Sequence, residues 1–143
     1  MKHTILSIIL LSILPLNASE LWSTNLDDSL KKAATENRIV LLEFTGSDWC
    51  PPCKKQAQDV FAQPAFEEFA KANLVLVKID FPRRSEQSPE IQAANEVLRR
   101  KYNVDGFPTL ILMDNQGGEL ARQSGYGGGG VEAFIEWVNK NKK

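Results

Sequence analysis

IVLLEFTGSDWCPPC, residues 39–53, joins an apolar run to the chain's only two cysteines, Cys50 and Cys53. The apolar run predicts a buried strand, and a helical pattern begins near Pro51, where proline is tolerated at the first helical position. Cys50 is therefore expected at a helix N-terminus, where free backbone N–H groups and the helix dipole favour thiolate over thiol. Cys53 lies one helical turn on, close enough to close a ring with Cys50. This arrangement is typical of reversible dithiol–disulfide exchange.

The size and composition of the chain limit what it can be. Its 143 residues suffice for one domain with a proper core, and the contents of 43% hydrophobic and 24% charged residues are ordinary for a globular protein. A formal charge of −1 provides no basic excess to neutralise phosphates. We therefore expect no nucleic-acid binding.

The first residues differ in character from the rest of the chain. Lys2 and His3 give a short positive start, and residues 5–14 are almost unbroken Ile and Leu before Pro15 ends the run. A charged start, a short apolar run and small residues after it are typical of a secretory signal peptide. The run is short for a helix that spans a bilayer, although an uncleaved anchor is the alternative.

We therefore expect residues 1–18 to be a signal peptide and residues 19–143 to form the functional domain. Cleavage is expected after Ala18, with Ser19 as the rival position. The mature protein would be exported, periplasmic or extracellular, with no stable membrane insertion. Disulfides form and persist in such compartments.

The only histidine of the chain, His3, falls within the expected signal peptide. The mature domain would then have no Cys–His pair, no Ser–His–Asp triad and no histidine-containing zinc site. Loss of Lys2 with the signal peptide would also change the formal charge from −1 to −2. We expect neither a metal nor an organic cofactor.

Hydrophobic periodicity and turn residues predict an alternating order of helices and strands. Helices are predicted over residues 29–36, 89–102 and 131–140. A further helix begins near residue 51, breaks at Pro64 and resumes over 65–72. Strands are predicted over 38–45, 74–80, 109–114 and 119–123, with a further short strand near 21–23. A helix between the two apolar strands makes them parallel, joined by a right-handed crossover. The last two strands form an antiparallel hairpin, so the fold class is α/β with one mixed sheet.

The sequence resembles the thioredoxin superfamily from roughly Leu30 to Val138. Three features carry the resemblance: WCPPC at residues 49–53, GFPT at residues 106–109 before the hairpin, and a glycine-rich loop before the last helix. It is similar to small exported thioredoxin-like proteins described as thiol–disulfide interchange proteins or disulfide isomerases, in which a strand ends in a sequence like FTGSDWC. The resemblance implies a three-layer α/β/α sandwich around a central mixed sheet.

The resemblance also implies roles for the residues of these motifs. Cys50 would be the exposed nucleophile and Cys53 the buried resolving thiol. Pro108 would be a cis proline that lies against the disulfide and offers backbone to an extended substrate. The alternative for Pro108 is a trans proline that opens an edge strand.

Four further residues are expected to form a substrate-binding platform with Pro108. They are Trp49, Phe107, Gly125 and Tyr126.

The resemblance further implies a buried acid that passes protons to the resolving cysteine, commonly six residues before the first cysteine. That position is Phe44 here, and Glu43 lies seven residues before Cys50. A carboxylate inside an apolar strand is costly without a purpose, so we expect Glu43 to be the proton shuttle. The alternative is an outward-facing strand residue. Leu76 replaces the lysine that often partners this acid, so we expect burial to raise the pKa of a poorly compensated Glu43.

Two other features stand near the predicted site. Arg83 and Arg84 follow a strand parallel to the one that bears Cys50, so they should lie at the same sheet edge; a solvated loop pair is the simpler interpretation. Residues 127–130, a run of glycines, are no phosphate-binding loop, because no Lys-Ser/Thr follows them. That run could instead form a rim beside the site.

These observations predict an exported thiol–disulfide oxidoreductase that acts on protein disulfides through Cys50 and Cys53. Its partners would be protein thiol or disulfide substrates and an upstream redox partner, and we expect a monomer. Whether it works as reductase, oxidase or isomerase depends on its reduction potential. The alternative is a redox-inert thioredoxin-fold module that binds a partner protein or a thiophilic metal.

Overall fold

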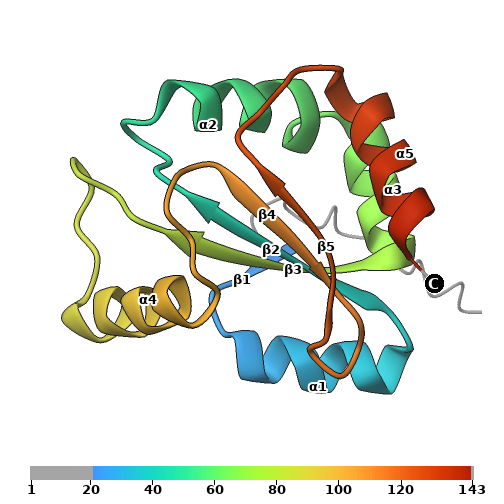
Figure 1. The fold of residues 1–143 in the computed structure, drawn as a ribbon, viewed down its shortest axis with the longest axis horizontal. Coiled ribbons are helices and arrows are strands. Elements are labelled where there is room, and N and C mark those ends of the chain that lie inside the picture. The colour runs from blue at the N-terminus through green and yellow to red at the C-terminus, as the bar shows by residue number, and fades with distance from the viewer. Residues whose placement is uncertain (1–20, 143) are drawn as a thin grey trace, which may run out of the picture.

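The structure, a computed structural model, describes residues 21–142, so the expected signal peptide lies outside the described residues. Five strands form one mixed sheet in the order β1-β3-β2-β4-β5 (Figure 1). The strands are β1 (Trp22–Ser23), β2 (Ile39–Thr45), β3 (Leu74–Asp80), β4 (Thr109–Met113) and β5 (Glu119–Ser124). Strands β1, β3 and β2 are parallel, whereas β4 pairs antiparallel with both β2 and β5. The predicted parallel pair, hairpin and short first strand are all confirmed.

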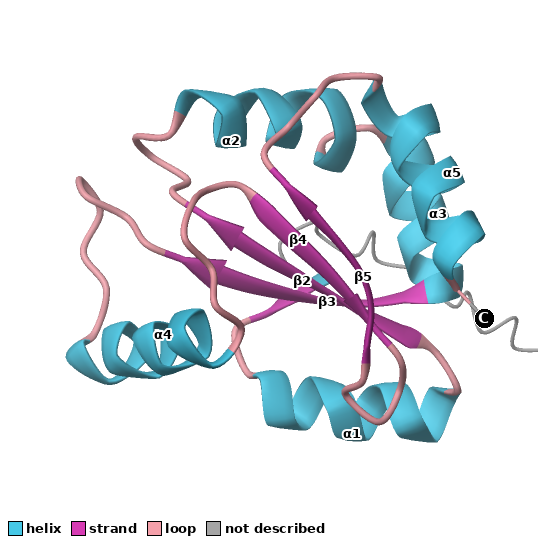
Figure 2. Cartoon of the chain, viewed as in Figure 1, coloured by secondary structure: helices cyan, strands magenta, loops and turns pink. Residues whose placement is uncertain are grey.

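Helices cover both faces of this sheet (Figures 1 and 2). They are α1 (Leu26–Glu36), α2 (Pro51–Gln56), the π-helical turn η2 (Ala57–Phe61), α3 (Pro64–Asn73), α4 (Pro89–Lys101) and α5 (Gly130–Asn141). Helices α1 and α4 lie on one side, and α2, η2, α3 and α5 lie on the other. The expected three-layer α/β/α sandwich is confirmed. None of the helices within residues 21–142 is both long and apolar enough to cross a bilayer.

Alternation along the strands divides the core into two clusters, one on each face of the sheet. In β2, Val40, Leu42 and Phe44 belong to the cluster that includes Leu26 of α1. Leu41 belongs to the opposite cluster, which packs against η2, α3 and α5. Glu43, two positions after Leu41 in β2, therefore faces the layer that contains α2.

Helix α1 begins three residues earlier than predicted. Asn25 is its N-cap, and the Asn25 side chain accepts a hydrogen bond from the backbone N–H of Asp28 at 3.0 Å. Leu26, its first residue, is 6% exposed and part of the core. The N-cap therefore precedes the two acidic residues of the first turn, Asp27 and Asp28.

The helical segment after the cysteines widens before it breaks. The N–H of Ala62 donates to the carbonyl of Ala57 at 2.8 Å, a bond five residues back that defines a π-turn. Pro64 then opens α3, so the predicted break is confirmed, with Pro64 as the first residue of the new helix.

The pattern over residues 89–102 predicts one apolar face made of Ile91, Ala94, Val97 and Leu98, but helix α4 packs differently. Leu98 contacts the core, but Ile91 and Val97 are exposed, Val97 by 64%. The buried residue of α4 is Asn95, whose side-chain amide donates to the carbonyl of Asp80 at 2.9 Å. A polar contact at the end of β3 therefore helps to hold this helix, together with the apolar contact of Leu98.

Candidate active site at the Cys50–Cys53 disulfide

The two cysteines lie where β2 ends and α2 begins. Cys50 is the N-cap residue of α2, and its backbone N–H donates to the carbonyl of Gly46 at 2.9 Å. Cys50 and Cys53 form a disulfide with their Cα atoms 5.3 Å apart. The prediction that this pair can close a ring is confirmed.

Both sulfur-bearing residues are buried in this oxidised form. Cys50 is 4% exposed and Cys53 is 1% exposed. The expectation of an exposed Cys50 is therefore wrong for the disulfide state, in which the carbonyl oxygen of Phe107 also lies 3.7 Å from the Cys50 Sγ atom. Cys50 is still the more accessible of the two.

The loop that faces the disulfide contains Pro108. The Phe107–Pro108 peptide bond is cis, so the trans alternative is wrong. The backbone N–H of Gly125 donates to the Pro108 carbonyl at 2.7 Å, which joins the start of the glycine-rich loop to this segment. The structure thus brings Cys50, Phe107, Pro108 and Gly125 together.

An aromatic shelf, which we define as Trp49, Phe81 and Phe107, flanks Cys50. The Trp49 Nε1–H donates to the carbonyl of Phe81 at 2.7 Å. The rings of Trp49 and Phe107 meet edge to face with centroids 6.2 Å apart, and Phe107 stacks on Phe81 at 5.0 Å. Sequence analysis missed Phe81, whose one signal was its place directly after a buried strand.

Glu43 lies on the same side of the sheet as Cys53. It is 2% exposed, so the alternative of an outward-facing strand residue is wrong. A cavity of about 300 Å³ is lined by Glu43, Cys53 and Lys78, among others. Burial raises the pKa of Glu43 from its ordinary value of 4.5 to about 7; the charge of Lys78 opposes this shift and that of Asp80 adds to it.

The lysine partner of this acid is present, which corrects the expectation that it was lost. Lys78 lies directly opposite Glu43 in the β2–β3 register, and its Nζ is 3.8 Å from the Glu43 Oε2. Leu76, the residue expected to replace it, lies opposite Leu41. The strand register explains this correction, since Leu76 and Lys78 share one face of β3 but Lys78 is the one opposite Glu43.

Comparison with known proteins agrees with this geometry. A family model described as a thioredoxin-like domain matches residues 26–141. The chain belongs to the thioredoxin-like family.

Proteins similar to this thioredoxin-like chain are named for thiol–disulfide chemistry. The disulfide bond reductase DsbH of Chlamydia pneumoniae is 33% identical over 129 residues, which cover 90% of this chain and 77% of that protein. The thiol:disulfide interchange protein DsbD of Actinobacillus pleuropneumoniae is 28% identical over 110 residues, 77% of this chain but 17% of that protein. A solved structure titled DsbH oxidoreductase has a TM-score of 0.77 and 28% identity, covering 99% of this chain and 94% of that one. The chain is thus a member of the thiol–disulfide oxidoreductases, with a disulfide-forming pair at Cys50 and Cys53.

The two thiols of the reduced thioredoxin-like domain should differ in reactivity. Cys50 caps α2, where the helix N-terminus favours its thiolate, whereas Cys53 lies a turn inside. Iodoacetamide at mildly acidic pH is therefore expected to label Cys50 first, as measured by peptide mass spectrometry over time. Preferential labelling of Cys53 would reverse the assignment of nucleophile and resolving thiol.

Gly46 leaves room for the indole ring of Trp49. A Cβ at Gly46 would come within 2.5 Å of a ring carbon of Trp49. We expect Gly46→Ala to displace the ring and lower the free energy of unfolding by about 1–3 kcal/mol, as overpacking does elsewhere. Denaturant unfolding measures the change, with Gly127→Ala as control because its Cβ would meet nothing within 4 Å. Equal stabilities of the two variants would show that the ring moves aside freely.

Tyr126 contacts the helical layer through its hydroxyl. The Tyr126 O–H donates to the Asp59 carboxylate at 2.9 Å, and the Lys55 Nζ lies 2.9 Å from the same oxygen. These two bonds hold the pKa of Asp59 below its ordinary value, and burial raises that of Tyr126. The loop is therefore tied to η2 by Tyr126, and contact of Tyr126 with substrate stays a prediction.

The segment after β3 is attached to the loop that precedes Cys50. The Asp48 carboxylate accepts hydrogen bonds from the backbone N–H groups of Arg83, Arg84 and Ser85 at 2.7–2.9 Å. These bonds, led by the one from Arg83, hold the pKa of Asp48 well below its usual range. The prediction that the arginine pair lies at the edge of the sheet that bears the cysteines is confirmed.

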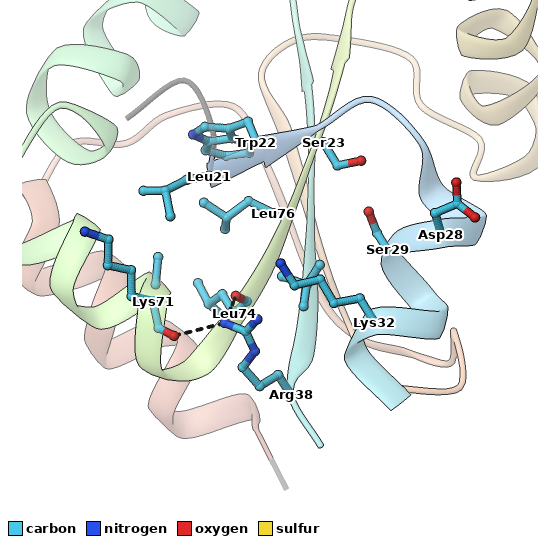
Figure 3. A pocket seen from close by; sticks show the side chains of 12 residues that line it. Leu21, Trp22, Ser23, Asp28, Ser29, Lys32, Arg38, Lys71, Leu74 and Leu76 are labelled. Carbon is cyan, nitrogen blue, oxygen red and sulfur yellow. Dashed lines mark hydrogen bonds between the residues drawn. The ribbon is translucent and has the colours of Figure 1, made fainter. Parts of the chain in front are cut away.

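A groove of about 430 Å³ lies at the other end of the parallel strands (Figure 3). Leu21, Trp22, Leu74 and Leu76 form an apolar lining, and Arg38 donates to the carbonyl of Lys71 at its rim. Arg38 immediately precedes β2, Leu74 begins β3, and Trp22 of β1 pairs with Leu76 of β3, whereas the cysteines follow the end of β2. The groove is therefore separate from the redox site, which lies at the carboxyl ends of the strands.

Proposed function

We propose that the mature chain is an exported oxidoreductase that reduces disulfides of other proteins through its Cys-Pro-Pro-Cys pair. The observation that carries this proposal is the Cys50–Cys53 disulfide at the N-terminus of α2, opposite the cis Phe107–Pro108 bond. A helix N-terminus favours the attacking thiolate, and the half-buried Phe107 beside Cys50 would be the first part of this loop to meet an extended peptide.

The reaction would proceed by two thiol–disulfide exchanges. The Cys50 thiolate attacks one sulfur of the substrate disulfide, forms a mixed disulfide and releases the other substrate sulfur as a thiolate that takes up a proton. The Cys53 thiolate then attacks the Cys50 sulfur and releases the second substrate thiol. Two electrons pass to the substrate, and the enzyme is left as the Cys50–Cys53 disulfide.

Glu43 would accept the proton that Cys53 must lose before it attacks. Both residues line the same cavity, and the Glu43 Oε2 has no hydrogen-bond partner among the described residues. A carboxyl with a pKa of about 7 exchanges protons readily near neutral pH. Lys78, whose Nζ lies 3.8 Å from the Glu43 Oε2, would stabilise the carboxylate before it accepts this proton.

The reducing direction is supported by the name of the DsbH relative, which is a disulfide bond reductase. A reductase must be reduced again, so the upstream partner would be a protein dithiol of lower potential. Export is supported by the composition of residues 1–18, and the mature protein is proposed to be a monomer.

A disulfide-reduction assay tests this function directly. The purified protein should accelerate insulin reduction by dithiothreitol, and Cys50→Ser should abolish the acceleration. Equilibration with glutathione should give a potential nearer the roughly −270 mV of thioredoxins than the roughly −120 mV of strong oxidants. No acceleration with wild-type protein would favour the redox-inert binding module. An oxidising potential would reject the reducing direction alone.

A further inference from the structure

Arg83 lies over the Trp49 ring of the aromatic shelf, beside the nucleophile. Its guanidinium carbon lies 3.5 Å from the centroid of the Trp49 ring, within the range of a close cation–π contact. Trp49 itself is fixed, because its Nε1–H donates to the Phe81 carbonyl and its ring fills the space beside Gly46. The cation is therefore placed next to the residue that precedes Cys50.

The backbone of Arg83 is held in place by Asp48. Three consecutive N–H groups, those of Arg83, Arg84 and Ser85, converge on the Asp48 carboxylate, and the Ser85 hydroxyl adds a fourth donor. The negative charge of Asp48 is thus engaged by the loop backbone. The loop presents Arg83 in a defined position although its side chain is exposed.

The guanidinium of Arg83 has no carboxylate partner within residues 21–142. Arg38, Arg99, Arg100 and Arg122 each form an ion pair with a glutamate. Arg83 and Arg84 are the arginines of this part of the chain that form none, and both belong to the loop at the redox site. Lys54, exposed on the first turns of α2, is likewise without an ion pair there, whereas Lys55 is paired with Asp59.

We propose that Arg83 is a specificity-determining residue that binds a carboxylate of the substrate protein beside its disulfide. The proposal rests on the reductase function above and deepens it, since it names the substrate class as disulfides within acidic segments. A guanidinium that stacks on an indole keeps its planar N–H fork free for a bidentate bond to a carboxylate. Such a contact would guide the substrate disulfide towards Cys50 before the first exchange.

Three peptides that share one disulfide and differ in two flanking residues test this proposal. The flanking pair is Glu, Gln or Lys, and kcat/KM for reduction is measured with wild-type protein. We expect the Glu peptide to be reduced about fivefold faster than the Gln peptide, the effect of one partly exposed charge pair, and the Lys peptide to be slowest. The preference should shrink in about 0.5 M salt, where exposed charges are screened.

Arg83→Gln is expected to bring the Glu and Gln peptides to equal kcat/KM. Arg84→Gln removes the same charge from the same loop without the stacked position, and Lys32→Gln removes it from α1; both should retain the preference. Equal rates of wild-type protein on all three peptides would overturn the proposal but not the function. Equal losses in Arg83→Gln and Arg84→Gln would also overturn it, because loop charge alone would then explain the preference. No reduction of any peptide would reject the proposed function and this site with it.

Discussion

Cys53→Ser is expected to arrest the protein as a mixed disulfide and to lower turnover by about 1,000-fold or more. Cys50 keeps its place at the N-terminus of α2 and can still attack, but no second thiol follows to release the substrate. Non-reducing electrophoresis and intact mass measure the trapped adduct, and insulin reduction measures turnover.

The matched control is Cys50→Ser, which should trap nothing. Cys53 is 1% exposed and lies behind Cys50, so it should not reach a protein disulfide by itself. Adducts that form on Cys50→Ser and not on Cys53→Ser would contradict the order of the two exchanges.

Glu43→Gln is expected to stabilise the fold at pH 8 by about 3 kcal/mol. Because burial raises the pKa of Glu43 from 4.5 to about 7, the folded state holds a proton that the unfolded state releases in this window. Wild-type stability should therefore fall as pH rises from about 4.5 to 7 and stay lower above it. The neutral glutamine removes this dependence. Denaturant unfolding at pH 4, 6 and 8 measures the difference between variant and wild type.

Glu67→Gln is the control for that measurement, since Glu67 pairs with Lys71 at the surface of α3. Glu67→Gln removes a carboxylate from the surface rather than from the core, so it should retain the pH dependence of wild type. If wild type and Glu43→Gln keep the same pH dependence, Glu43 does not titrate in this window.

Glu43→Gln should also slow the second exchange, the attack of Cys53 on the mixed disulfide, about 100-fold at pH 7. This factor is the low end of what a positioned proton acceptor contributes to a rate. Decay of a preformed mixed disulfide, followed by stopped flow, isolates that step from the first. The effect should diminish towards high pH, where Cys53 loses its proton to solvent. A first exchange slowed as much as the second would place Glu43 in another role.

Much of the fold could be predicted because its signals are local. The run over Leu74–Asp80 gives both ends of β3, and its apolar residues predict a strand buried on both faces. The loop of residues 115–118 predicts the hairpin of β4 and β5 in the same way. Propensity and turn chemistry act over a few residues, so they can be read without knowledge of distant contacts.

Helix α4 marks the limit of this approach. Its apolar residues suggested a face turned to the core, but Val97 is exposed and the polar Asn95 is buried. Asn95 is held by the Asp80 carbonyl, fifteen residues earlier in the chain. Periodicity predicts which residues share a face, but the partner of that face depends on tertiary packing.

Local sequence is enough to specify the chemistry of this protein: two thiols at x₂ spacing lie at the start of a helix that Pro51 opens after a buried strand. The surroundings of those thiols depend on tertiary packing. It placed Lys78 rather than Leu76 opposite Glu43, and it joined Asp48 to the loop that bears Arg83. The reason is physical: spacing along a strand or helix is fixed by backbone geometry, whereas the face of a side chain and its distant partners follow from how strands register and layers pack.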